Sequence, residues 1–436
     1  MSTPSHPQPP PMRIPWTAVG ETASPEDLAT LVRFLLPPAA GHQAEYEAAA
    51  ARLEAALAEL AAHATAPAQL TLGPHVRRLE AEARRLFGVR HACFLTNATA
   101  GLEIAHQLIG LQPGDEVIVP PLTFIATMAY PLGVGAKVVF ADVDPHTLNL
   151  DPADVERKLT PRTRAVIPVH LGGWPVAMAP LMELSRRHGF YVIEDAAHAI
   201  GGRYQGRPLG TIGHFGAFSF HQVKNITSFG EGGLLLSNEA VAAQFPQARY
   251  LGIDPARQAA GWIYDVTGVT SLRGHAVQPG NHSATEIAAL GLLCQLERLP
   301  AILARRRAMA ARLTRRLGGV PGLRPQRLDT ADCQGTFMVY QIQVEPDVLG
   351  QDVQALKRKL TARGIAQIPQ YVPLYHYEIL RRLGYDAAAA AAACPVAEEA
   401  YRHRFTHLPL GGLTDAQLDT MAEAVLDAVA EMKAGR

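Results

Sequence analysis

The chain has few cysteines and no excess of charge of either sign. Its four cysteines form neither a CxxC pair nor a spacing typical of metal ligands, so we expect no metal site and reduced, buried thiols. They are Cys93, Cys294, Cys333 and Cys394. Acidic and basic residues are equal at 40 each, so no overall field favours binding to nucleic acid or to an anionic membrane.

Long apolar runs and a dinucleotide motif are also missing. No apolar run reaches the roughly 18 residues of a membrane span, and the proline-rich start, MSTPSHPQPPPMR, lacks the apolar core of a signal peptide. No apolar run that could form a strand is followed by a GxGxxG turn. We therefore expect a soluble, cytoplasmic protein that binds neither membranes nor nucleic acid.

Short apolar runs alternate with amphipathic helical segments between about residues 70 and 240. Such an alternation predicts an α/β fold in which helices cover both faces of a mostly parallel sheet. In sheets of this kind, ligands bind beyond the carboxyl ends of the strands. The expected strands are 91–96, 116–120, 137–143, 164–170, 190–195, 215–220 and 233–237.

The remaining segments predict the domain organisation. The proline-rich composition of residues 1–15 predicts disorder, and residues 16–69 read as a helical N-terminal segment. We expect a large α/β domain over residues 70–285. Residues 286–436 would form a long helix followed by a small α+β domain.

An acidic pair ends one of the expected strands. The run FYVIED closes on Glu194 and Asp195, and His198 follows. In one interpretation Asp195 caps a helix N-terminus. In the other it pairs with a protonated heteroaromatic nitrogen, which the pyridine ring of pyridoxal 5′-phosphate (PLP) requires in order to act as an electron sink.

The segment FSFHQVKNITSFGEGG places a lysine just past another strand. Lys224 has apolar neighbours and a glycine-rich turn behind it, which indicates a confined position in place of the usual exposed one. A partly desolvated lysine has a lowered pKa and can form a Schiff base. Ser219, five residues earlier, offers a hydroxyl group to a phosphate.

Two further segments fit the same kind of ligand. In TNATAGLEIA, Ala98 and Thr99 open a helix whose free N–H groups suit an anion, although Asn97 or Thr99 could simply cap that helix. In VIVPPLTFIAT, Phe124 follows a strand and could stack on a flat cofactor, although a lone phenylalanine is more often part of the core.

Taken together, these residues resemble the DegT/DnrJ/EryC1/StrS family of sugar aminotransferases. The resemblance runs from about residue 70 to the C-terminus and includes PGNHSATEIAALGLLCQLERL, which is similar to the family's Gly-Tyr-Asn-Tyr-Arg-type segment. The string VIEDAAHAIG…FSFHQVKNIT…GEGG is similar to the branch that makes 4-amino-4-deoxy-arabinose from UDP-4-keto-pentoses. The resemblance implies PLP-dependent transferase fold type I, the aspartate-aminotransferase type. It also implies a homodimer with active sites at the subunit interface.

The resemblance also assigns roles to residues of this chain. Lys224 would be the catalytic residue, forming the Schiff base with PLP and moving protons. Asp195 would hold the pyridine nitrogen, His198 would lie near the ring hydroxyl, and Phe124 would stack on the ring. The phosphate ligands would be Ala98, Thr99 and Ser219, with Asn281 reaching the phosphate from the other subunit.

The chain departs from the family pattern in two places. His282 and Ser283 stand where the family has tyrosine and arginine, and Gly280 stands where the preceding tyrosine would be. If that arginine helps to hold a donor carboxylate or a sugar, its loss bears on substrate class. Family members also reach the Gly-Pro turn, here at residues 73–74, much sooner, so the helical stretch 36–66 is extra.

We therefore predict a PLP-dependent aminotransferase that moves an amino group from glutamate or glutamine to a keto-sugar, which the resemblance indicates is nucleotide-linked. A cyclitol-ketone aminotransferase of the same fold is the main alternative. A PLP-binding regulator without turnover is an alternative of another class. A dehydratase of the family is disfavoured, because the resemblance would lead us to expect histidine in place of Lys224.

Overall fold

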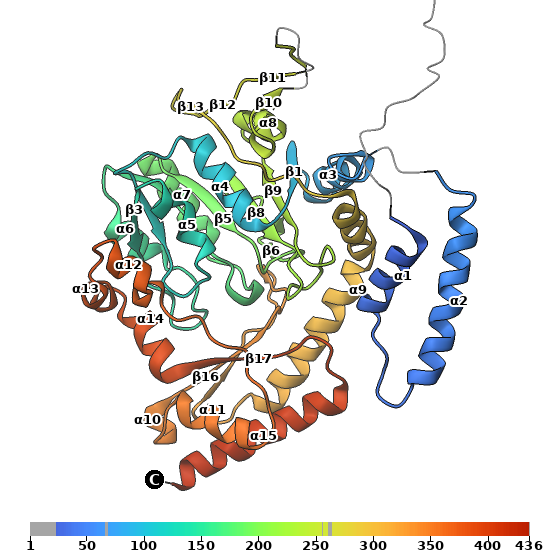
Figure 1. The fold of residues 1–436 in the computed structure, drawn as a ribbon. Helices are drawn as coiled ribbons and strands as arrows, with labels where there is room; N and C mark the ends of the chain where they lie inside the picture. Colours follow the sequence, from blue (N-terminus) through green and yellow to red (C-terminus); the bar gives the residue numbers. More distant parts are fainter. Residues whose placement is uncertain (1–22, 66–68, 255, 260–263, 436) are drawn as a thin grey trace, which may run out of the picture. The chain divides into compact units, whose positions relative to one another are not determined.

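The computed structural model describes residues 23–65, 69–254, 256–259 and 264–435 (Figure 1). The disorder predicted for residues 1–15 lies outside this part of the chain. The chain divides into two compact units, Met1–Gly73 and Pro74–Arg436. The division at residue 286 between a large and a small domain stays a prediction.

The first unit contains two helices, α1 (Pro25–Leu35) and α2 (Gln43–Ala61). Ser24 begins α1 with a capping box, because its side chain accepts the Asp27 N–H group while Asp27 accepts that of Ser24. An ion pair of 2.8 Å between Arg33 and Glu47 joins the two helices. Two helices therefore occupy the stretch that the sequence predicted to be helical.

The second unit is built on a seven-stranded sheet with the order β1-β9-β8-β5-β4-β2-β3. All seven expected strands are present, with ends that differ by a few residues, and only β9 runs antiparallel to its neighbours. The mostly parallel α/β prediction is confirmed. The strands are β1 (His91–Leu95), β2 (Glu116–Val119), β3 (Lys137–Phe140), β4 (Thr163–Val166), β5 (Tyr191–Asp195), β8 (Phe215–Ser219) and β9 (Gly233–Ser237).

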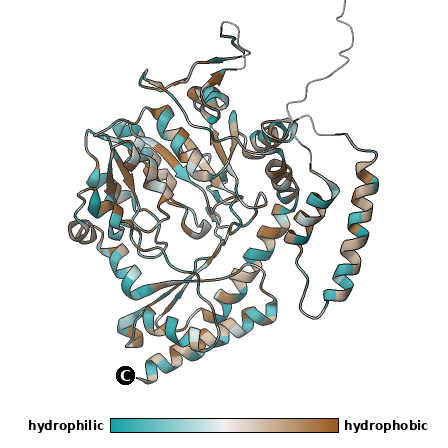
Figure 2. Cartoon of the chain, viewed as in Figure 1, coloured by the Kyte–Doolittle hydropathy of each residue, from teal (hydrophilic) through white to brown (hydrophobic). Residues whose placement is uncertain are grey.

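Helices cover this sheet, and short two-residue strands lie outside it. In Figure 2 the brown, hydrophobic colour follows the strands of the sheet, whereas the outer helices alternate brown and teal. The helices are α3 (Pro74–Phe87), α4 (Ala98–Ile109), α5 (Ala126–Gly133), α6 (Pro152–Lys158), η1 (Leu171–Gly173), α7 (Met178–His188), η2 (Ala240–Gln244) and α8 (Phe245–Arg249). The short strands are β6 (Arg203–Tyr204), β7 (Arg207–Pro208), β10 (Ile253–Asp254), β11 (Asp265–Val266), β12 (Val269–Thr270) and β13 (Ala276–Val277).

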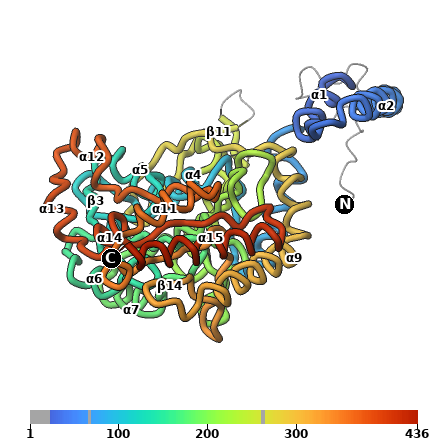
Figure 3. The backbone as a smooth tube through the Cα atoms, turned by 90° about the horizontal axis from the view of Figure 1, so that it is seen from below, coloured from blue at the N-terminus to red at the C-terminus, as the bar shows by residue number. Residues whose placement is uncertain are grey.

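The C-terminal part has its own core around the antiparallel sheet β14-β16-β17. Helix α9 lies beside α15 (Figure 3), and a salt bridge of 3.1 Å between Arg316 and Glu423 joins them. The strands are β14 (Leu323–Pro325), β15 (Cys333–Gln334), β16 (Tyr340–Val344) and β17 (Phe405–Leu408). The helices are α9 (Glu286–Leu317), α10 (Pro346–Leu349), α11 (Val353–Ala362), η3 (Leu374–His376), α12 (Glu378–Arg382), α13 (Ala387–Ala392), α14 (Pro395–Glu399), the π-helical η4 (Ala400–Arg404) and α15 (Asp415–Ala434).

One expectation from the sequence was wrong, and one helix needs comment. By length and composition, α9 would be apolar enough to cross a membrane, and a third of its most apolar window is buried within the protein. Core helices of globular proteins meet the same criterion, and α9 packs on α3 and α15. The expectation that all four cysteines are buried was wrong for two of them. Cys294 is exposed and Cys333 is half-buried, because both lie on outer elements away from the central sheet.

A glycine in β8 allows the tightest backbone packing of the sheet region. A Cβ atom on Gly216 would lie 2.1 Å from the carbonyl oxygen of Gly210, so backbone must move to admit it. We expect Gly216→Ala to lower the free energy of unfolding by roughly 1–3 kcal/mol or more. Thermal melting checks this. Gly133→Ala is the matched control, since nothing lies within 4 Å of that added Cβ. Equal melting temperatures for both variants would contradict the packing argument.

Candidate active site

The carboxyl ends of β1, β5 and β8 meet at one edge of the central sheet. Asp195 ends β5 and Ser219 ends β8, and the two strands pair in parallel. Ser219 pairs with Gly233 of β9, which in turn pairs with Leu95 at the end of β1. The residues that the sequence singled out on separate segments are thus brought to the same edge.

Asp195 is buried and accepts hydrogen bonds on both carboxylate oxygens. The Thr127 hydroxyl in α5 donates to Oδ2 at 2.9 Å, and the Ala197 N–H group donates to Oδ1 at 3.2 Å. Burial raises the pKa of Asp195, although these donors and the charge of Lys224 oppose the rise. A buried carboxylate in this balance gains from a nearby cation, which a protonated pyridine nitrogen would supply.

Lys224 lies in a tight turn that follows β8. The turn is fixed by backbone bonds from Lys224 N–H to His221 at 2.9 Å and from Gln222 N–H to Gly230 at 2.9 Å. Burial lowers the pKa of the Lys224 ammonium to about 8, while Asp195 and Glu231 act in the opposite direction. The neutral amine that Schiff-base formation requires is therefore far more abundant near neutral pH than in an ordinary lysine, at roughly a tenth of the molecules.

The N-terminus of α4 offers backbone donors beside Ser219. Asn97 caps the helix by accepting the Ala100 N–H group at 2.9 Å, as one interpretation of the sequence expected. That cap leaves the N–H groups of Ala98 and Thr99 without a partner among the described residues. The start of β9 packs closely against this helix terminus, since a Cβ atom on Gly233 would lie 2.2 Å from the Asn97 carbonyl. Ordinary capping and anion binding are thus compatible at this terminus.

His198 is held from both sides of its ring. Its Nδ1 accepts the Gly172 N–H group at 3.2 Å, and its Nε2 lies 3.4 Å from the Tyr371 hydroxyl. Its carbonyl accepts the Thr336 hydroxyl at 2.6 Å, and Asn225, the neighbour of Lys224, donates to the Thr336 carbonyl at 2.9 Å. His198 is therefore linked to the lysine turn through buried polar groups.

Sequence reasoning missed two of these partners, Tyr371 and Thr127. Thr127 lies within the quoted segment VIVPPLTFIAT, three residues after Phe124, so its helical spacing was a usable signal. Tyr371 lies 173 positions from His198, in a segment with no distinctive local pattern. Only the tertiary fold reveals it.

The two remaining predicted residues lie at the surface of the chain. Phe124 is 57% exposed in the turn between β2 and α5, so its ring is not part of the core. Asn281 is exposed and its side chain accepts the Ser283 N–H group at 3.0 Å. Among the described residues, no hydrogen bond joins Asn281 to Ala98 or Thr99 of its own chain.

Glu194 differs from its neighbour Asp195 because it holds structure together. Its carboxylate pairs with His170 at 3.0 Å and accepts the N–H groups of Gly210, Ile212 and Gly213. With so many partners it is fully buried and has no capacity for a ligand. Of the acidic pair, only Asp195 remains a candidate for the site.

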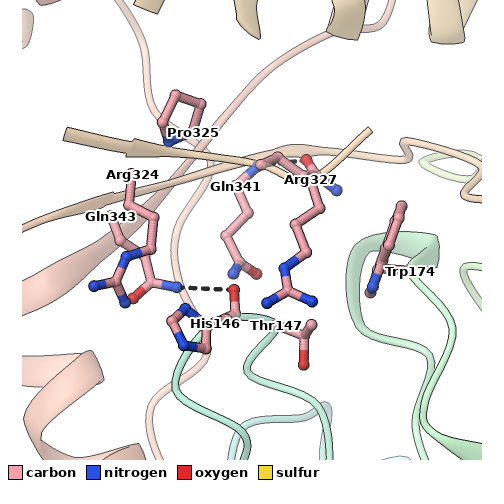
Figure 4. A pocket seen from close by; sticks show the side chains of 9 residues that line it. His146, Thr147, Trp174, Arg324, Pro325, Arg327, Gln341 and Gln343 are labelled. Carbon is pink, nitrogen blue, oxygen red and sulfur yellow. Dashed lines mark hydrogen bonds between the residues drawn. The ribbon is translucent and has the colours of Figure 1, made fainter. Parts of the chain in front are cut away.

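A separate crevice, lined on one side by Trp174, lies between β14, β16 and the loop after β3 (Figure 4). Gln343 donates there to the His146 carbonyl at 3.2 Å, and the side chains of Gln341 and Arg327 point into the same space. Its volume is about 10 Å³. Because that is about the space of one water molecule, the crevice is too small for an amino acid or a sugar.

Comparison with known proteins identifies the family. The model of the DegT/DnrJ/EryC1/StrS aminotransferase family matches residues 52–426. The chain belongs to this family. The spore coat polysaccharide biosynthesis protein SpsC of Bacillus subtilis (strain 168) is 35% identical over 374 residues, which cover 83% of this chain and 91% of that protein. The protein is thus an aminotransferase, and enzymes of this family depend on PLP.

Two solved structures agree with this assignment and with fold type I. The sugar aminotransferase CalS13 from Micromonospora echinospora has a TM-score of 0.72 and 29% identity, covering 82% of this chain and 93% of that one. Spr1654 from Streptococcus pneumoniae, solved in a PLP form, has a TM-score of 0.73 and 26% identity, covering 84% and 94%. The edge described above, with a lysine of lowered pKa, a buried aspartate and free helix N–H groups, suits that cofactor.

The lowered pKa of Lys224 predicts how cofactor capture depends on pH. The rate at which the apoenzyme forms a lysine-linked PLP should rise with pH and level off above about pH 8, because only the neutral amine attacks. Stopped-flow absorbance measures the rate, and borohydride reduction followed by peptide mass mapping should place the cofactor on Lys224. A plateau reached only near the ordinary lysine value, or an adduct on another lysine, would contradict the assignment.

Proposed function

We propose that this aminotransferase moves an amino group from glutamate or glutamine to a keto-sugar carried on a nucleotide, with PLP bound to Lys224. The observation that carries the proposal is a buried aspartate at the end of β5 together with a lysine of lowered pKa in the turn that follows the adjacent parallel strand β8, each influencing the pKa of the other. SpsC is a polysaccharide biosynthesis protein and CalS13 is a sugar aminotransferase, which supports a sugar acceptor.

In this proposal each residue at the sheet edge has one task. Bound PLP supplies an electron sink for the bond-breaking steps. Lys224 anchors the cofactor and, once released, carries the proton from one carbon to the next as base and then acid. Asp195, held in place by Thr127, keeps the proton on the ring nitrogen. His198 would lie near the ring hydroxyl.

The phosphate and the ring face would be held by the neighbouring residues. The N–H groups of Ala98 and Thr99 and the Ser219 hydroxyl would bind the phosphate, since a helix N-terminus favours an anion. The exposed ring of Phe124 would cover one face of the cofactor. All three phosphate donors are uncharged, so a further donor would strengthen the site.

We propose that this further donor is Asn281 of a second subunit in a homodimer, in the cytoplasm. Its side chain is exposed, and the segment around it is fixed by the bridge between Tyr250 and Asn281. Thr285, not Asn281, caps α9, since it accepts the Ala288 N–H group at 3.1 Å. The side-chain oxygen of Asn281 accepts the Ser283 N–H group, and its N–H₂ group, which has no partner among the described residues, would be the donor to a partner's phosphate.

The missing family arginine affects substrate choice. Ser283 occupies its position, and the neighbouring His282 has its Nε2 3.4 Å from the Glu103 carboxylate of the same chain. His282 therefore faces an internal acid and is a poor substitute for an arginine that would bind a substrate carboxylate or phosphate. We expect the acceptor to be recognised without that contact.

The function is tested by following the cofactor spectrum through each half of the reaction. Adding glutamate to the holoenzyme should convert the lysine-linked form to the aminated form, and a nucleotide-linked keto-sugar should convert it back. Asp195→Asn should fold normally yet lose several orders of magnitude in rate, with each tenfold loss equal to about 1.4 kcal/mol of barrier. Recovery by cyclitol ketones alone would favour the alternative acceptor class. No conversion by any amino donor would refute turnover.

Shared active sites predict complementation between two inactive variants. Lys224→Ala removes the anchoring amine, and Asn281→Asp places a carboxylate against the phosphate. Mixed dimers should regain one working site, giving up to about half of wild-type activity per hybrid. Activity after mixing, with hybrids verified by native mass spectrometry, is the measurement.

The matched control for this experiment is Asn238→Asp. Asn238 is also exposed but follows the opposite end of β9 from Gly233. We expect that variant to be active alone. Verified hybrids that stay inactive, or a fully active monomer, would reject the shared site.

A further inference from the structure

The imidazole ring of His198 is fixed in one protonation form by its surroundings. Because Nδ1 accepts the Gly172 N–H group at 3.2 Å, that nitrogen carries no proton. Burial lowers the pKa of His198 well below its ordinary value, and the charge of Lys224 lowers it further. The ring is therefore neutral, and its one proton is on Nε2.

The Tyr371 ring and hydroxyl define where that proton points. The two rings are nearly parallel, with an angle of 15° and centroids 6.3 Å apart, and the hydroxyl lies 3.4 Å from Nε2. The segment that carries Tyr371 is tied to β17 by a bond of 2.9 Å from Ile368 N–H to the His407 carbonyl. Tyr371 thus connects the C-terminal sheet to the edge of the central sheet where the proposed cofactor site lies.

The contact between His198 Nε2 and the Tyr371 hydroxyl is weak enough for a stronger acceptor to replace it. At 3.4 Å it is beyond the usual range for an N–H···O bond. Burial raises the pKa of Tyr371 to about 12, so the phenol stays neutral and is a modest acceptor. An oxyanion accepts a charge-assisted bond that is roughly twice as strong. The Nε2 proton would therefore pass to an anionic oxygen placed beside it.

We propose that Tyr371 is a positioning residue that holds His198 as a neutral Nε2–H donor to the ring oxygen of bound PLP. This inference rests on the proposed function. Tyr371 acts by stacking on the imidazole, and the Gly172 N–H group keeps the proton on the correct nitrogen. Other titratable groups also face His198, namely Lys224, His170, His407 and, through Tyr371, Asp195.

None of these four groups would replace His198 as the hydrogen-bond donor to the ring oxygen. His407 is fully buried and its pKa is lowered to about 4, so it is neutral. The Nε2 of His170 is engaged with Glu194, and its Nδ1 accepts the Val176 N–H group at 3.1 Å. Lys224 is the anchoring amine of the proposed site, and Asp195 has no proton to donate while it is ionised.

The test is the pH titration of the absorbance of lysine-linked PLP in the holoenzyme. A donor to the ring oxygen stabilises its negative charge. Losing that donor leaves more negative charge next to the linked nitrogen, which then keeps its proton to higher pH. We expect Tyr371→Leu to raise the midpoint by about 0.5 to 1 pH unit. Tyr371→Phe keeps the stacked ring, so its midpoint should stay close to that of the wild type.

Two further variants separate positioning from a general structural effect. In a His198→Ala background, which has its own raised midpoint, adding Tyr371→Leu should change nothing, because Tyr371 acts only through His198. Tyr385→Leu is the matched control: Tyr385 is also half-buried, and its hydroxyl accepts the Val138 N–H group in the edge strand β3. An unshifted Tyr371→Leu midpoint, an additive double variant, or an equal shift in Tyr385→Leu would overturn the proposal.

A measurement on the wild type covers the case in which Tyr371→Leu does not fold. With ¹⁵N-labelled histidine, NMR of the holoenzyme should show His198 neutral with the proton on Nε2 between about pH 6 and 9. A charged ring or a proton on Nδ1 would overturn the proposal. Failure of the proposed function is distinct, because the wild type would then show no absorbance band from PLP on Lys224.

Discussion

The electrostatic coupling of Asp195 with Lys224 is the constraint on which the rest of the site depends. Both groups are buried, and burial opposes the charge on each: it raises the pKa of the acid and lowers that of the amine. Each charge in turn favours the other. This arrangement keeps an acid that can hold a cation and an amine that can lose its proton within one small region.

The central sheet brings these groups together through the parallel direction of β5 and β8 and the register in which they pair. Asp195 and Ser219 end parallel strands, and the antiparallel β9 returns Gly233 to the start of α4. Because a larger residue at position 233 would meet backbone, the distance between the lysine turn and the helix N-terminus is set by main-chain packing. Side-chain flexibility therefore has little influence on where the phosphate donors lie.

Much of this could be predicted from the sequence, because the relevant signals are local. Apolar runs bounded by turns located all seven strands, and the residues just past strands β5 and β8 had to reach one edge. Tyr371 could not be predicted in the same way, and for Thr127 the sequence offered only its spacing from Phe124. Their contacts with His198 and Asp195 span 173 and 68 positions, so only tertiary packing defines them.

The long helix α9 explains why one expectation about a cysteine was wrong. Glu297 and Arg298 interrupt the apolar run of α9, yet one 18-residue window of the helix is still apolar enough by composition to cross a membrane. A scan for uninterrupted runs overlooks this. Cys294 lies on the same helix and is exposed, since a helix of 32 residues presents one side to solvent even when another packs on the core.

The helix terminus beside Ser219 has a consequence for how the enzyme would respond to its medium. Peptide N–H groups and a hydroxyl do not titrate in the range where Lys224 changes charge, and they carry no net charge for salt to screen. The protein groups at such a phosphate site would therefore keep the same hydrogen-bonding capacity while Lys224 gains or loses its proton. Binding of the phosphate and formation of the bond to Lys224 would thus respond differently to pH. A change of pH would alter the Lys224–PLP bond, while the protein groups that bind the phosphate would stay unchanged.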